Sequence, residues 1–121
     1  MELTPEIQAA ARHLGQCMRQ EDGVRKYLEA LEETHTDPEA SALEKNMYDE
    51  YERLIAREQA VEILSYEYTR DFYELRQQVQ DHPLISRRNR MHGLIRPYLY
   101  QIAEEISFVL GVDYTALARP H

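Results

Sequence analysis

The sequence predicts an all-α protein, and three observations carry that prediction. Apolar residues recur at spacings of three and four along nearly the whole chain, as they do on one face of a helix. Only four Gly and five Pro occur in 121 residues, too few for the many tight turns of an all-β fold. Signals typical of strands are absent. We expect one domain over residues 1–121: a bundle of about five helices, with long antiparallel helices packed as in a coiled coil.

The first two helices are expected at residues 5–20 and 24–35. Thr4 offers a hydroxyl N-cap, and Pro5 follows at the first helical position, where its missing N–H does no harm. An apolar stripe then runs at spacings of four, three and four, through Ile7, Ala11, Leu14 and Met18. The second helix carries the stripe Val24, Leu28 and Leu31 and should end in a polar stretch at residues 33–36.

The next two helices are expected at residues 38–58 and 65–80. Asp37 and Pro38 repeat the start signal of the first helix. Residues 39–82 contain no Gly or Pro, so the apolar pattern fits either one very long helix or two helices broken between Ala60 and Ser65. We expect two helices, because one continuous helix would be much longer than the helices against which it packs. The sequence itself leaves residues 56–65 open as turn or helix.

The last helix is expected at residues 84–110, followed by a short tail at residues 112–121. His82 and Pro83 mark its start, and Gly111 is a natural C-terminal stop. Pro97 lies inside the helix and removes the hydrogen bond to the carbonyl of Gly93. Because a glycine four residues earlier relieves some crowding, we expect a kink at Pro97 and not a break.

Composition narrows the class of protein. The chain has 14 basic and 22 acidic side chains, a formal charge of −8. Cys17 is the single cysteine, which excludes an internal disulfide framework and a zinc or iron–sulfur site built from cysteines of one chain. No apolar run is long enough to span a membrane, and residues 1–6 do not resemble a signal peptide. We therefore expect a cytoplasmic protein that does not insert into membranes.

Residue patterns for catalysis or metal binding are weak. No serine or cysteine lies in a nucleophile motif, and no glycine-rich loop could cradle a phosphate. His13 and Cys17 share one face of the first helix, and His35 could add a third ligand, but a closed zinc site needs four. We expect neither an enzyme nor a bound cofactor or metal; a metal-binding helical bundle is an alternative.

A basic cluster lies early in the last helix and is the candidate partner-binding site: Arg87, Arg88, Arg90, His92 and Arg96. It could contact an acidic partner protein or RNA phosphates. The acidic balance of the whole chain disfavours direct contact with nucleic acid, which stays as an alternative. The simpler interpretation is a solvated face that pairs with the acidic first half of the chain.

The aromatic residues of the chain suit contacts between helices, called helix seams below. The chain has nine Tyr, two Phe and no Trp, and tyrosine combines a large apolar ring with a polar tip, which suits partly wet helix contacts. A thin bundle of long helices cannot cover all its apolar stripes alone, so we expect a homodimer. The candidate residues of the dimer or helix seam are Tyr51, Tyr68, Phe72, Met91, Ile95, Tyr98 and Ile102.

Several short motifs follow one another in a set order. They are Ala10-Ala11 with Leu14-Gly15, Tyr27-Leu28-Glu29-Ala30, Asp37-Pro38-Glu39-Ala40, His82-Pro83-Leu84-Ile85 and Leu110-Gly111-Val112-Asp113. In this order the chain resembles the YlbF/YmcA/YheA family of small bacterial helical proteins, from about Leu3 to Asp113. It departs from the family in lacking a glycine turn near its middle and in having Pro97.

The resemblance implies an all-helical, dimer-forming cytoplasmic protein with no enzymatic activity of its own. Relatives act as regulators of competence, sporulation and biofilm formation, in a complex that modulates mRNA processing by a membrane-associated ribonuclease; an effect on a phosphorelay is a further possibility. An iron–sulfur cluster is not carried over, because Cys17 is alone. The function that we expect is therefore a regulatory adaptor that binds other proteins, with ribonuclease-complex components among its partners.

Overall fold

The computed structural model describes residues 1–60 and 66–120, and helices are the only regular elements among them. The all-α prediction is confirmed. In chain order, the helices are α1 (Pro5–Arg19), α2 (Asp22–Thr36), α3 (Pro38–Gln59), α4 (Tyr66–Asp81), α5 (Pro83–Leu110) and α6 (Tyr114–Ala118). No helix in the described part of the chain is both long and apolar enough to cross a membrane.

Three helices begin as the sequence predicts, with a capping side chain followed directly by proline. Thr4 Oγ1 accepts a hydrogen bond from the N–H of Ile7 at 3.2 Å and opens α1. Asp37 Oδ2 accepts from the N–H of Ala40 at 2.9 Å and opens α3. His82 opens α5, where its Nδ1 accepts from the N–H of Leu84 at 3.3 Å. These caps satisfy N–H groups that have no partner inside the helix.

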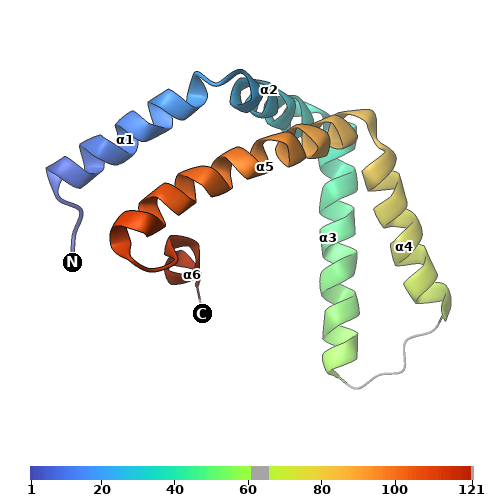
Figure 1. Cartoon of the computed structure of the whole chain (residues 1–121). Coiled ribbons are helices and arrows are strands. Elements are labelled where there is room, and N and C mark those ends of the chain that lie inside the picture. Colours follow the sequence, from blue (N-terminus) through green and yellow to red (C-terminus); the bar gives the residue numbers. More distant parts are fainter. Residues whose placement is uncertain (61–65, 121) are drawn as a thin grey trace.

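The middle of the chain forms two helices. α3 ends at Gln59, with Ala60 as its C-cap, and α4 begins at Tyr66 and packs antiparallel to α3 (Figure 1). The predicted break between Ala60 and Ser65 falls in residues 61–65, which lie outside the described residues. Two separate antiparallel helices therefore cover residues 38–59 and 66–81.

The C-terminal end differs from the expected tail. α5 runs unbroken through Pro97 to Gly111, whose left-handed backbone (φ 79°) turns the chain. Asp113 then caps α6 by accepting from the N–H of Thr115 at 3.2 Å. Residues 112–121 thus contain a short helix that the sequence did not predict, because five helical residues are too few to show a period.

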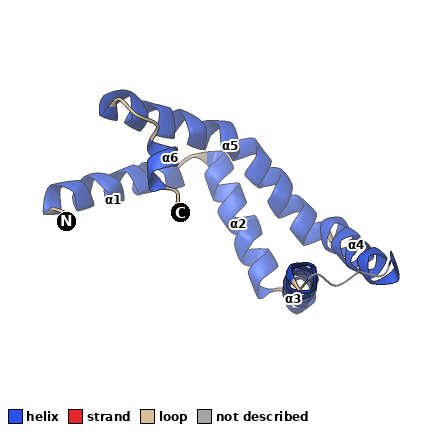
Figure 2. Ribbon diagram, turned by 90° about the horizontal axis from the view of Figure 1, so that it is seen from below, coloured by secondary structure: helices blue, strands red, loops and turns tan. Residues whose placement is uncertain are grey.

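The helices form two arms that meet at an elbow (Figure 1). The hairpin arm consists of α3 and α4. The long arm consists of α2 packed on the N-terminal half of α5, with α1 and α6 near its other end. Figure 2, seen from below, shows the two arms running in different directions from this elbow.

The core lies at the elbow, where both arms begin. Ala40, Val79 and Ile85 are buried against one another, and Leu43 and Met47 pack on them. Thr34 is buried beside this cluster, where its hydroxyl donates to the carbonyl of Ala30 at 2.8 Å. Smaller buried sites continue along the arms, at Val24, Ala30 and Ile95 in the long arm and at Phe72 in the hairpin arm.

Candidate functional site

The basic cluster lies on α5 near the elbow, and one of its arginines pairs with a glutamate of another helix. Arg88 faces Glu44 of α3, with Nη1 to Oε1 at 2.7 Å and Nη2 to Oε2 at 2.8 Å. Both side chains are only 18% exposed. The hydrogen bonds to Glu44 raise the pKa of Arg88 above its ordinary value. Arg88 therefore joins α5 to α3 through a charge-assisted, two-point contact.

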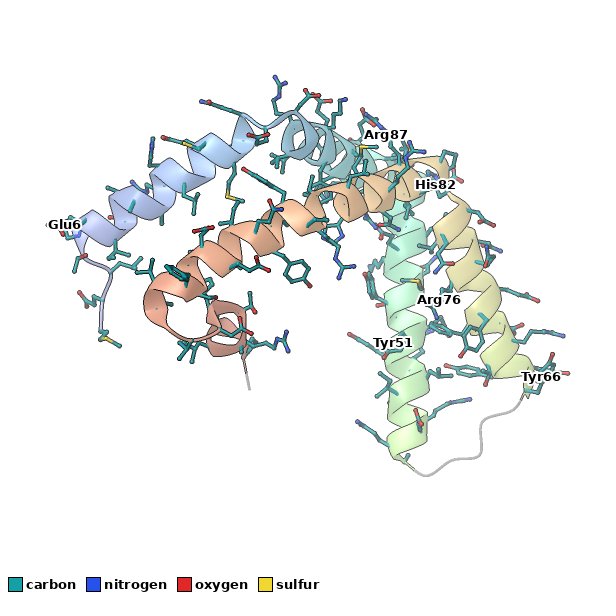
Figure 3. The ribbon with its side chains drawn as sticks, in the orientation of Figure 1. Glu6, Tyr51, Tyr66, Arg76, His82 and Arg87 are labelled. Carbon is teal, nitrogen blue, oxygen red and sulfur yellow. The ribbon has the colours of Figure 1, made fainter. Side chains whose placement is uncertain are left out.

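Arg87 makes a second bridge to the acidic half of the chain. Its Nη1 lies 2.6 Å from Oε2 of Glu33, near the end of α2. Both side chains are more exposed than the Arg88 pair, at 38% and 47%. Figure 3 shows Arg87 near His82 at the elbow. Two residues of the candidate partner-binding set thus pair within the chain, as the simpler interpretation of the sequence expects.

The remaining members of the cluster face solvent. Arg90 is exposed and makes neither a hydrogen bond nor an ion pair within the described residues. Arg96 is also exposed, and its guanidinium lies 6.0 Å from the ring of Tyr100. His92 stacks at a tilt on Tyr27 of α2, with ring centres 5.5 Å apart. Arg90 is therefore the arginine of the cluster that is exposed and has no charged or aromatic partner within the described residues.

A shallow hollow of about 360 Å³ lies beside the Arg88 pair. Its lining comes from three helices and consists of Tyr27, Leu31, Glu44, Tyr48, Arg88, Asn89 and His92. The sequence placed Tyr27 only in a family motif and gave no functional role to Glu33 or Glu44. Their roles depend on which helices meet at the elbow, and helical spacing within each segment carries no signal of that.

The predicted seam residues separate into different places. Tyr51 and Phe72 pack between α3 and α4, with ring centres 5.9 Å apart. Tyr68 lies on the same arm, 3.5 Å from Glu50 through its hydroxyl, and its ring stacks under the guanidinium of Arg57. These contacts hold the hairpin arm together within one chain.

The seam residues on α5 divide at Ile95. Ile95 is buried, and its methyl group lies close to Gly23 at the start of α2. Met91, one turn earlier, is half-buried. Tyr98 and Ile102 lie beyond the last buried residue of the helix and are half-buried. The structure therefore does not bring the seven seam residues into one surface.

A groove of about 770 Å³ lies where α6 folds back beside the end of α5. Tyr100, Ser107 and Phe108 line it from α5, and Val112 and Thr115 from the chain that follows. The backbone N–H of Tyr114 donates to Ser107 Oγ at 2.9 Å and fixes this return. The sequence offered no sign of the groove, because α6 was not predicted.

The candidate metal ligands do not converge. Cys17 Sγ lies 3.7 Å from Nε2 of His13 on the exposed face of α1. His35 lies in the last turn of α2, so most of that helix separates it from the pair. Among the described residues, no group of three or more His, Cys, Asp or Glu side chains could hold a metal ion.

Only the comparison with protein-family models gives a match. No curated protein and no solved structure matches the chain. The family model described as control of competence regulator ComK, YlbF/YmcA, matches residues 7–108, which includes all of α2, α3 and α4 and most of α1 and α5. The chain therefore belongs to the YlbF/YmcA family, whose description is the control of a competence regulator.

Proposed function

We propose that the protein is a non-enzymatic regulatory adaptor, which acts as a homodimer and binds another regulatory protein. The observation that carries the proposal is the family match over residues 7–108, because the family is described by its control of a regulator. The fold supports it, since long helices with exposed apolar and charged faces offer extended surfaces to protein partners. The proposed setting is the cytoplasm.

The proposed docking surface is the solvent-facing part of the basic cluster, with Arg90 at its centre. Arg87 is three residues before Arg90 and therefore shares its side of α5. Arg96 and His92 also belong to the candidate set, but at six and two residues after Arg90 they lie on another side of α5. Arg88 belongs to the original candidate set, but its pair with Glu44 gives it a structural role. The complementary partner would carry an acidic face.

The proposed output is a developmental switch such as competence, sporulation or biofilm formation. The family description supports competence. The resemblance set out above adds the other two and supports modulation of mRNA processing by a ribonuclease complex. Components of such a complex are the partners that we propose.

The test is a mild purification of tagged protein from its native host, with the accompanying proteins identified by mass spectrometry. We expect regulatory or ribonuclease proteins at ratios near one to one. In a parallel purification, Arg90→Glu should remove the partner. Arg76→Glu on the hairpin arm makes the same charge change away from the cluster and should retain it (Figure 3).

Two results would overturn parts of the proposal. If Arg90→Glu, and also Arg87→Glu, retain the partner, the basic cluster is not the docking surface. If RNA is recovered without any protein, and purified chain shifts RNA in a salt-sensitive gel assay, the protein is a nucleic-acid-binding regulator instead.

A further inference from the structure

We infer that a second copy of this chain covers the far end of the long arm. This far-end surface consists of the apolar stripe of α1 and of the part of α5 that follows Ile95, residues 96–110. The inference rests on the proposed homodimer and names its interface. It places the interface away from both the elbow and the hairpin arm.

The first half of the argument concerns α1. This helix has an apolar stripe but contains no buried residue. Ile7 is 56% exposed and Leu14 is 38% exposed. An isolated helix of this length is only marginally stable in water, because its few turns do not offset the cost of nucleation. α1 therefore needs a partner surface for its apolar stripe.

The second half concerns α5. Ile95 is its last buried residue, and residues 96–110 match α1 in length. Their stripe has helical spacing of four, four and three, through Tyr98, Ile102, Ile106 and Val109. Val109 is 84% exposed. Two short apolar stripes of similar spacing thus lie near one end of the molecule, and neither contains a buried residue.

The area available is close to what a stable dimer needs. Besides the stripes, Leu3, Phe108, Leu110, Val112 and Leu117 are exposed at this end. If the large exposed side chains contribute ~100 Å² each, the surface reaches several hundred Å² per copy. A standard protein interface buries about 800 Å² on each partner, polar rim included.

Charge favours contact between an α1 segment and an α5 segment of this sequence. α1 carries Arg12 and Arg19 against Glu6, whereas residues 96–110 carry Glu104 and Glu105 against Arg96. Opposite net charges make α1 of one copy complementary to α5 of the other. A two-fold axis repeats that contact, so each copy contributes one α1 and one α5 segment to a four-helix bundle.

The experiment measures the mass of the purified full chain in solution by light scattering after size exclusion. We expect twice 14.3 kDa for the natural sequence. Leu14→Glu and Val109→Glu should each weaken dimerisation at least tenfold, because a carboxylate would be buried in the seam. Both positions are exposed in the single chain, so circular dichroism should still show a folded helical protein.

Two matched controls test the location. Gln16→Glu places the same charge on the polar side of α1, and Tyr73→Glu places it on an exposed aromatic of the hairpin arm. Both should remain dimers. A monomeric natural sequence would overturn the inference, since α1 and α5 would then stay uncovered or close on each other within one chain.

A dimer that survives Leu14→Glu and Val109→Glu but dissociates with Tyr73→Glu would also overturn it. That outcome would move the interface to the hairpin arm and leave the proposed homodimer standing. Recovery of the native partner protein by the monomeric variants would show that adaptor function does not depend on this surface, so the two proposals can fail separately.

Discussion

Arg88 and Glu44 join α5 to α3 through two parallel hydrogen bonds, 2.7 and 2.8 Å long, at the edge of the elbow core. Each side chain is mostly covered, so water and salt screen this pair less than an exposed one. Arg87 and Glu33 make a single contact nearby with greater exposure. The two pairs bring α5 against the acidic half of the chain, but they should differ in energy.

Glu44→Ala should lower the free energy of unfolding by about 2 kcal/mol, because the mostly covered Arg88 guanidinium loses its charged acceptor and keeps only the hydrogen bonds to Asn89 Oδ1. Urea denaturation followed by circular dichroism measures the change. Glu33→Ala is the matched control and should cost less than about 1 kcal/mol, since that pair is exposed. Equal losses for the two variants would contradict a special role for the Arg88–Glu44 pair.

Asp37 should matter more to global stability than Thr4, although both cap a helix. Asp37 caps α3 beside the core, and its Oδ2 lies 3.7 Å from Nε2 of His82, the cap of α5. We expect Asp37→Ala to destabilise by about 1–2 kcal/mol. Thr4→Ala should fray α1 with a smaller effect on the urea midpoint, because α1 buries no residue. A larger shift for Thr4→Ala would show that α1 is part of the cooperative core.

Two glycines of α5 should respond to alanine with opposite signs. Gly93 lies inside the helix, and a Cβ added there meets no atom within 4 Å, so Gly93→Ala should stabilise by roughly 0.5–1 kcal/mol. Gly111 has φ +79°, which strains any L side chain, so Gly111→Ala should destabilise by about 1 kcal/mol. Thermal melts of both variants test this pair. Stabilisation by Gly111→Ala would contradict the left-handed turn before α6.

Ile85 and Leu94 lie on the same helix and differ in burial. Ile85 is fully buried in the elbow core, and Leu94 is 68% exposed. Ile85→Ala should cost about 3 kcal/mol, which includes the cavity that it leaves. Leu94→Ala should change stability by no more than about 0.5 kcal/mol. Denaturant unfolding measures both effects: with an unchanged m-value, the midpoint should fall clearly for Ile85→Ala and hardly move for Leu94→Ala.

The helix starts could be predicted because their signals are local. A capping side chain followed by proline acts within one turn, and Thr4, Asp37 and His82 cap their helices as the sequence suggests. The stop at Gly111 is equally local, because it depends on one left-handed residue. Local chemistry of this kind does not depend on where other helices lie.

The partners of the candidate residues could not be predicted. Helical spacing shows which α5 residues share a stripe, but not that Ile95 is the last to be buried or that Arg88 would face Glu44. Both outcomes depend on where α2 and α3 cross α5, which is decided by contacts between distant segments. The pairing of basic α5 with the acidic half could be anticipated from charge alone, though without naming Glu33 or Glu44.

The small elbow core has a consequence for the life of the protein in its host. Few large side chains are fully buried, so a chain without its partner has a modest barrier against local opening. Binding stabilises a folded state by mass action, and proteases act on the opened one. We expect the half-life of the protein to rise and fall with the supply of its partner. Degradation of the unbound protein alone would then match its amount to that of the partner.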